Sequence, residues 1–166
     1  KISSGSIVLN KERLDLTELL HQSIGEFSEK LEDKQLEIVF SGGEQPANIY
    51  ADSRRMWRVI ENLFHNICKY AMKGTRVYLD LTVENGRVCT AIKNISESRM
   101  NISPEELTER FIRGDESRSE EGSGLGLSIA KSLVQLQGGE FTIYLDGDLF
   151  KVVIEFPEYA GTLQET

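Results

Sequence analysis

Two alternating segments joined by Asn85-Gly86 constrain the fold of this chain most strongly. In residues 76–84 and 87–93, hydrophobic and polar residues alternate, so that one side of each segment can be buried while the other faces water. Asn-Gly readily adopts the two positive φ angles of a tight two-residue hairpin turn. The chain is therefore predicted to contain an antiparallel strand pair. The side of the first strand that should be buried carries Val77, Leu79, Leu81 and Val83.

Other segments show the hydrophobic spacing of helices or of further strands. Apolar residues recur every three or four positions from residue 15 to residue 31, and again in 52–72 and 127–137, which indicates amphipathic helices. Further strands are predicted at 36–40, 140–145 and 149–156. Paired strands with interspersed helices predict an α+β fold (an α/β sandwich). We expect a mixed, mostly antiparallel sheet of about five strands, covered on one face by about three helices.

The 166 residues fit one domain with a hydrophobic core of its own. We expect the domain at 13–158, preceded by a linker or short edge strand at 1–12 and followed by a tail at 159–166. Residues 95–121 have weak periodicity, which is typical of a functional lid or a disordered loop. Within them, Ser103, Pro104 and Glu106 predict a short capped helix.

Composition excludes several function classes. A formal net charge of −8 argues against a general nucleic-acid binder, which needs a basic surface. The sequence has neither an apolar run long enough to span a membrane nor a start that resembles a signal peptide, so we expect no direct membrane contact. Cys68 and Cys89 lie in apolar stretches without the spacing of a disulfide or zinc framework, which favours the cytoplasm.

A row of polar residues follows one face of the second predicted helix. Arg58, Asn62, Asn66, Lys69 and Lys73 are spaced by three or four residues and therefore share that face. One interpretation is a solvated helix surface; the other is the polar wall of a nucleotide pocket. In the second case an asparagine oxygen suits Mg²⁺, and Lys69 with its neighbour Tyr70 could contact phosphates.

A glycine-rich loop opens directly into the third predicted helix. Its residues are Gly122, Ser123, Gly124, Leu125, Gly126 and Leu127. Closely spaced glycines let a backbone approach an anion, and a helix N-terminus adds N–H groups and a positive dipole end. The spacing matches neither the dinucleotide fingerprint nor a Walker loop. From the residues alone, a flexible hinge and a phosphate-binding loop are equal alternatives.

Together these segments resemble a known family. Residues 62–70 resemble the asparagine box of bacterial sensor histidine kinases, residues 109–119 their phenylalanine box, and residues 122–127 their second glycine box. Gly138-Gly139 stands where the family ends the following helix. The resemblance covers roughly residues 5–158 and has three boxes in the family's order. The chain is thus similar to the catalytic and ATP-binding domain of these kinases, which has the Bergerat-type fold of gyrase-like (GHKL) ATPases.

The resemblance implies a set of site residues and two cofactors, ATP and Mg²⁺. Asn66 would coordinate Mg²⁺, and Asn62 would line the same pocket. Lys69 and Tyr70 would contact the phosphates, while Arg113 would stabilise charge at the γ-phosphate during transfer. The backbone amides of residues 122–127 would hold the phosphate chain.

One box departs from the family pattern. Sensor kinases place Asp-Xaa-Gly-Xaa-Gly after the fourth strand, with the aspartate accepting a hydrogen bond from the adenine amino group. Here the corresponding residues are Asn94, Ile95, Ser96, Glu97 and Ser98. Asn94 can accept the same bond without a charge, which is worth roughly 1 kcal/mol less. We therefore expect weakened ATP binding.

The resemblance also implies partners that must supply the remaining chemistry. Neither His21 nor His65 lies in the motif of a phosphate-accepting histidine. The acceptor would be on the parent kinase's dimerisation and phosphotransfer helices, with a response regulator downstream and this part in the cytoplasm. Two alternatives are a degenerate module that binds nucleotide or partner without catalysis, and an ATP-hydrolysing relative with Glu61 as general base.

Overall fold

The computed structural model describes residues 8–97 and 125–160. The elements in chain order are β1 (Lys11–Asp15), α1 (Leu16–Glu26), α2 (Ser28–Asp33), β2 (Glu37–Ser41), β3 (Asn48–Asp52), α3 (Ser53–Tyr70), β4 (Arg76–Glu84), β5 (Arg87–Ile95), α5 (Leu125–Leu136), β6 (Glu140–Asp146) and β7 (Leu149–Pro157). The predicted lid, including the short helix expected at 103–106, lies outside the described residues from residue 98 on, as does most of the predicted tail.

The main sheet has five strands in the order β2-β4-β5-β7-β6. Only the β2–β4 pair is parallel; the other three pairs are antiparallel. The predicted hairpin joins β4 to β5, and both turn residues have positive φ, 51° at Asn85 and 74° at Gly86. The prediction of a mixed, mostly antiparallel sheet is confirmed.

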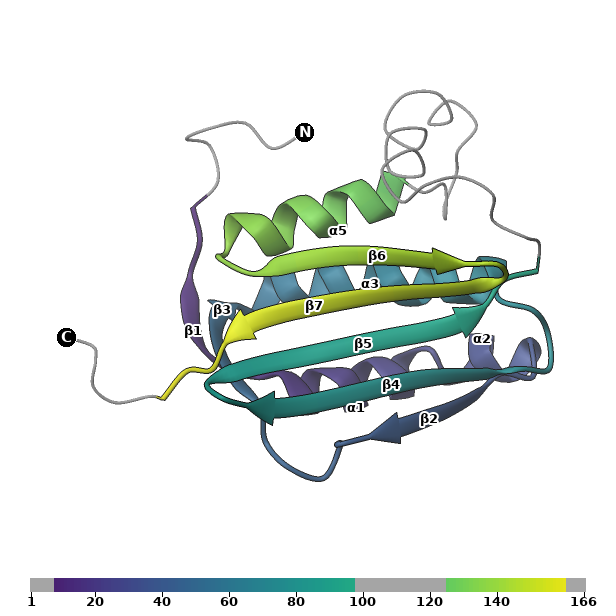
Figure 1. Ribbon diagram of the computed structural model, residues 1–166, viewed down its shortest axis with the longest axis horizontal. Helices are drawn as coiled ribbons and strands as arrows, with labels where there is room; N and C mark the ends of the chain where they lie inside the picture. The colour runs from purple at the N-terminus through teal and green to yellow at the C-terminus, as the bar shows by residue number, and fades with distance from the viewer. Residues whose placement is uncertain (1–7, 98–124, 161–166) are drawn as a thin grey trace.

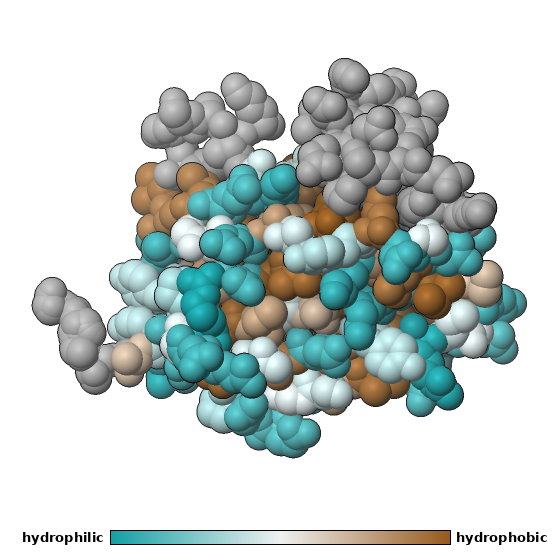
Figure 2. Space-filling view, in the orientation of Figure 1, coloured by the Kyte–Doolittle hydropathy of each residue, from teal (hydrophilic) through white to brown (hydrophobic). Residues whose placement is uncertain are grey.

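The helices cover one face of this sheet. Figure 1 shows α1, α3 and α5 on the same side of it, while the other side carries no helix among the described residues. The burial pattern agrees, because in β5 every second residue is buried: Val88, Thr90, Ile92 and Asn94. Over the open face, Figure 2 shows hydrophilic side chains interspersed with hydrophobic ones. The core therefore lies between sheet and helices, as expected for a sandwich.

A second, two-stranded sheet was not predicted. β1 pairs antiparallel with β3, with Lys11 opposite Asp52 and Asp15 opposite Asn48. The sequence signal was weak because β3 is only five residues long and follows Pro46. Tyr50 on β3 stacks on Tyr159, with ring centroids 5.1 Å apart, and this stack fastens the chain after β7 to the small sheet.

The periodic segment from residue 15 to residue 31 forms two helices rather than one continuous helix. The break between α1 and α2 falls at Phe27, two residues after Gly25, and glycine is a poor helix former. Asp15 caps α1 by accepting a hydrogen bond from the Thr17 backbone N–H at 3.1 Å. The buried stripe is nevertheless as predicted, since Leu16, Leu20, Phe27 and Leu31 all enter the core.

Asp52 is the residue at which the N-terminal segment meets α3. Its carboxylate accepts hydrogen bonds from the backbone N–H groups of Asn10 (2.9 Å), Arg54 (3.0 Å) and Arg55 (3.2 Å). Burial by itself raises the pKa of Asp52, but these three N–H groups and the Arg55 guanidinium together hold it below its ordinary value. The carboxylate is therefore the N-cap of α3 and also holds the chain that enters β1.

Gln137, which follows α5, is also hydrogen-bonded to Asp52 at the start of α3. Its Oε1 accepts a hydrogen bond from the Asp52 backbone N–H at 2.7 Å, and its Nε2 donates to the Leu133 carbonyl at 2.9 Å. The side chain is only 2% exposed, so both groups are satisfied inside the protein. Gln137 thus links the start of α3 to the end of α5.

Candidate functional site

The two predicted asparagines lie one turn apart on α3, beneath the core side of the sheet. Asn66 is 8% exposed, and Asn62 is half-buried. The Asn62 Nδ2 atom is buried and has no hydrogen-bond partner. An unpaired buried amide is costly, and such groups recur at binding sites. The interpretation of this helix face as a solvated surface is therefore wrong for these two residues.

The start of α5 lies directly against Asn62. A Cβ atom added to Gly126 would come within 3.4 Å of the Asn62 Cβ and Cγ atoms, so this glycine permits close approach of the two helices. Leu127 is buried in the core and holds the first turn of α5 in place. The first turn of α5, whose end carries the positive pole of the helix dipole, therefore packs against Asn62.

Asn94 completes the described part of this region from the sheet. It is 3% exposed, on the inner face of β5. Backbone hydrogen bonds tie the end of β5 to the end of α3. The Met72 N–H donates to the Ile95 carbonyl at 2.7 Å, and the Glu97 N–H donates to the Tyr70 carbonyl at 2.8 Å. The strand end and the asparagine helix are thus held together.

The remaining predicted site residues are only partly described. Lys69 is exposed at the end of α3 with its Nζ 5.8 Å from the Tyr70 ring centroid, and Tyr70 is half-buried. Leu125 is the first residue of α5. Arg113, Gly122, Ser123 and Gly124 lie outside the described residues. The start of α5 packs against α3 at Asn62, and the end of β5 is hydrogen-bonded to the residues at the end of α3.

Lys34, which sequence reasoning missed, holds the C-terminus of α3. Its Nζ donates to the carbonyls of Lys69 (3.1 Å) and Ala71 (2.7 Å) and pairs with the Glu97 carboxylate at 3.4 Å. A cation at this position satisfies carbonyls that have no partner within the helix and is favoured by the helix dipole. The residue follows α2 and gives no motif signal, because only the tertiary fold brings it to α3.

Replacing Lys34 with methionine should lower the free energy of unfolding by about 1–2 kcal/mol, because two carbonyls at the end of α3 lose a charged donor. Chemical denaturation of both proteins measures the difference. Glu97→Gln is the matched control: its carboxylate is 56% exposed, so this change should cost less than about 0.5 kcal/mol. Equal losses in the two variants would contradict the role of the helix terminus.

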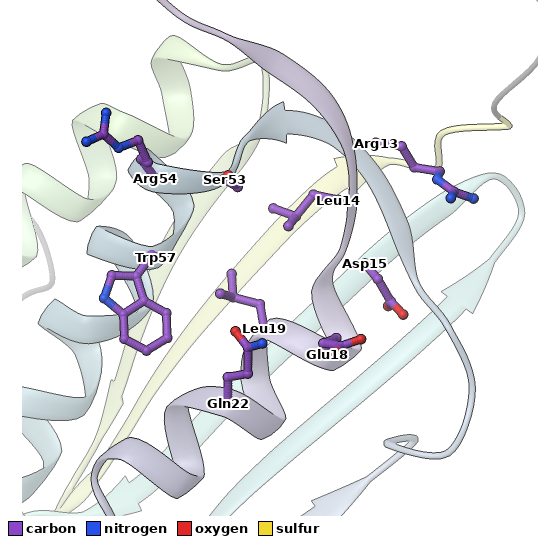
Figure 3. Close-up of a pocket in the computed structure, with 9 residues that line it drawn as sticks. All are labelled: Arg13, Leu14, Asp15, Glu18, Leu19, Gln22, Ser53, Arg54 and Trp57. Carbon is purple, nitrogen blue, oxygen red and sulfur yellow. The ribbon is translucent and has the colours of Figure 1, made fainter.

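A separate groove lies at the opposite end of α3. It has a volume of about 630 Å³ and runs between β1, α1 and the first turns of α3. Figure 3 shows Leu14, Leu19 and Trp57 along it, with the Arg13 and Arg54 side chains pointing outward. The full lining is Arg13, Leu14, Asp15, Glu18, Leu19, Gln22, Ser53, Arg54 and Trp57. None of the predicted nucleotide-site residues belongs to it.

The structure describes the surroundings of both cysteines and both histidines. Both cysteines are free, and burial raises the pKa of each thiol, with Glu155 adding to the effect at Cys89. His21 is exposed and its Nε2 lies 2.9 Å from the Gly43 carbonyl, while His65 packs edge-on against Phe27.

Within residues 8–97 and 125–160, no group of three or more His, Cys, Asp or Glu residues could hold a metal ion. None of the described helices is long and apolar enough to cross a membrane.

The same fold occurs in solved kinase domains. The catalytic domain of the histidine kinase ThkA matches 90% of this chain and 97% of its own, with a TM-score of 0.75 and 21% identity. The mycobacterial sensor histidine kinase MprB matches 90% of this chain and 98% of its own, with a TM-score of 0.69 and 26% identity. The fold is thus that of histidine kinase catalytic domains.

Sequence comparison identifies the family. Residues 51–160 match the family described as histidine kinase-, DNA gyrase B- and HSP90-like ATPases, and the chain belongs to it. Its relatives include the probable sensor protein PcoS of Escherichia coli, 32% identical over 89% of this chain, and the kinase/phosphatase MprB of Mycolicibacterium vanbaalenii, 31% identical over 80%. The chain spans only about a third of these relatives, 32% and 27% of their lengths. Its class is therefore the ATP-binding catalytic domain of sensor histidine kinases.

Proposed function

We propose that the chain binds ATP·Mg²⁺ and donates the γ-phosphate to a histidine on a separate dimerisation and phosphotransfer domain of a two-component sensor kinase. The observation that carries the proposal is the unpaired, buried Nδ2 atom of Asn62, which lies against the first turn of α5, with Asn66 buried one helical turn further along α3. Asn62, Asn66 and Asn94 would offer amides to a nucleotide, and the helix N-terminus would offer N–H groups to its phosphates.

Each residue has a defined part in this proposal. The Asn66 side-chain oxygen is a hard ligand that fits Mg²⁺, an ion that takes its other ligands from phosphates and water. The unpaired Asn62 Nδ2 provides a donor beside it. Lys69, Tyr70 and the backbone of residues 122–127 bind the phosphate chain. Arg113 stabilises the charge that develops at the γ-phosphate during transfer.

The partners follow from the same proposal. The acceptor histidine belongs to the dimerisation and phosphotransfer helices of the parent kinase, and the phosphate passes from there to a response regulator. The parent is a membrane sensor with this part in the cytoplasm.

A second candidate function is a degenerate module without catalysis. It is favoured by two replacements: Asn94 stands in place of the acidic residue of the family pattern, and Ser96 in place of its first glycine. Both residues are 3% exposed.

Titration calorimetry with a non-hydrolysable ATP analogue, with and without Mg²⁺, tests the proposal. The wild-type chain should bind more tightly with Mg²⁺, and Asn66→Ala should lose roughly tenfold or more of that affinity because the ion loses an oxygen ligand. Arg54→Ala is the control, since this exposed residue lies on the same helix twelve positions away, about 18 Å along its axis.

Two results would count against the proposal. Magnesium dependence that survives in Asn66→Ala would remove the assigned ligand. Absence of wild-type binding at millimolar nucleotide would favour the degenerate module. Transfer to the histidine is measured separately, by mixing the chain and labelled ATP with the parent's helical hairpin, and it should be lost in Arg113→Ala.

A further inference from the structure

The groove between β1, α1 and the first turns of α3 has an apolar floor. Trp57 and Leu14 are half-buried and pack against the core, and Leu19 is buried. The three side chains come from three different elements, and the space between them measures about 630 Å³ (Figure 3). Tryptophan is enriched among the anchor residues of protein interfaces, where it lies in a pocket lined by apolar side chains.

Two arginines stand at the rim of this groove without carboxylate partners. Arg13 on β1 and Arg54 at the start of α3 are exposed, and both side chains point outward in Figure 3. Among the described residues, neither has a carboxylate within ion-pairing distance, whereas Arg76 and Arg87 each have one. Because the chain has a net charge of −8, a shortage of acidic side chains does not explain the difference.

The carboxylates that line the groove do not neutralise these arginines. Asp15 is engaged as a helix cap, since its Oδ1 accepts hydrogen bonds from the backbone N–H groups of Thr17 (3.1 Å) and Ala47 (3.0 Å). Glu18 is exposed in the first turn of α1, across the groove from Arg54 in Figure 3. The rim formed by β1 and α3 therefore carries two unpaired positive charges beside the apolar floor.

The direction of the two guanidinium groups favours a protein partner over a small ligand. A ligand confined to the groove would leave both groups in water, because they point away from the floor. A helix laid between α1 and α3 would place apolar side chains on the floor and acidic side chains at the rim, since residues three or four positions apart share a face. Arginine and carboxylate pair through two parallel hydrogen bonds, which adds orientation to the attraction.

We propose that this groove is the docking site for an acidic amphipathic helix of a partner protein. Trp57, Leu14 and Leu19 receive the apolar face of that helix, and Arg13 and Arg54 pair with glutamate or aspartate side chains on its flanks. The inference does not depend on the proposed nucleotide-binding function, because none of the residues that line the groove belongs to the nucleotide site.

Trp57 is the single tryptophan of the chain, so its fluorescence reports on this groove. The probe is a tryptophan-free helical peptide of about 15 residues, with leucines along one face and glutamates on both flanks. Titrated into the full chain, it should shift the Trp57 emission with a dissociation constant of about 100 µM or tighter. A peptide with lysines in place of the glutamates should bind at least about tenfold more weakly, because the two arginines repel it.

Charge reversal tests the two arginines separately. Arg13→Glu and Arg54→Glu should each weaken binding of the acidic peptide about tenfold, since each removes one ion pair and adds a repulsion. Glutamate suits the first turn of a helix, so Arg54→Glu should stay folded, which thermal unfolding checks. Lys73→Glu is the matched control: it changes the net charge equally at an exposed residue beyond the other end of α3, and affinity should stay within about twofold.

Several results would overturn the inference. An unchanged Trp57 emission at about one millimolar acidic peptide would exclude a helix of this chemistry. Equal binding of the acidic and the basic peptide, or binding that survives both charge reversals, would leave an apolar surface without selection for charge. Trp57 emission that changes with protein concentration alone, together with dimers in sedimentation, would assign the groove to a second copy of this chain.

Discussion

Replacing Phe64 with alanine should lower the free energy of unfolding by about 3–5 kcal/mol. The Phe64 side chain is completely buried on the core side of α3, and its ring packs against that of Phe27 with centroids 5.4 Å apart. Removing the ring takes away its transfer free energy and leaves a cavity that the surrounding helices cannot fully close. Chemical denaturation followed by circular dichroism measures the loss.

Phe64→Leu is the matched control because leucine retains much of the buried volume. It should cost clearly less than the alanine variant, on the order of 1–2 kcal/mol. A loss below about 1 kcal/mol for Phe64→Ala would mean that α3 is not packed as described. Since Phe64 lies between Asn62 and Asn66 in the chain, its packing also determines which way the asparagines face.

Asp52→Ala should destabilise the protein by about 2–3 kcal/mol at neutral pH, because three buried or half-buried backbone N–H groups lose their acceptor at the start of α3. The effect should depend on pH. The pKa of the folded Asp52 carboxyl lies below its ordinary value of 3.8, so the ionised carboxylate stabilises the fold above that value. This stabilisation is lost as the pH falls through the folded pKa.

Unfolding measured between about pH 2 and pH 7 checks this prediction. The difference between wild type and Asp52→Ala should be constant above about pH 5 and shrink in the acid range. Asp52→Asn keeps an acceptor for the N–H groups but cannot ionise, so it should retain part of the stability and lose the pH dependence. A difference that grows on acidification would have the wrong sign for a lowered pKa.

Much of the architecture could be predicted from the sequence because it depends on local pattern. The alternation in β4 and β5, with the Asn85-Gly86 turn between them, specifies a hairpin without reference to the rest of the chain. The spacing of apolar residues in α3 likewise specifies its buried face. The β1–β3 sheet could not be predicted in the same way, since each strand has five residues and is stabilised by pairing with a segment far away in the chain.

The same distinction between local and long-range features applies to the candidate site. Asn62, Asn66 and the glycine-rich loop were identifiable because they follow one another in ordered boxes whose chemistry suits phosphate and Mg²⁺. Lys34 and Gln137 were not identifiable, because each acts on backbone groups 35 or more positions away. A lysine or glutamine has no local feature that indicates such a partner.

The sequence by itself determined the five strands of the main sheet, the buried stripes of the helices, the family and the residue types available for nucleotide chemistry, because periodicity and motif order are properties of neighbouring residues. Only the tertiary structure decided that Gly126 packs against Asn62 and that the Asn62 Nδ2 atom is buried without a hydrogen-bond partner. It also decided that Asp52 joins the entry of the chain to α3. These features require segments distant in the chain to approach within hydrogen-bonding or van der Waals distance, and that approach is set by packing of the whole core rather than by any one segment.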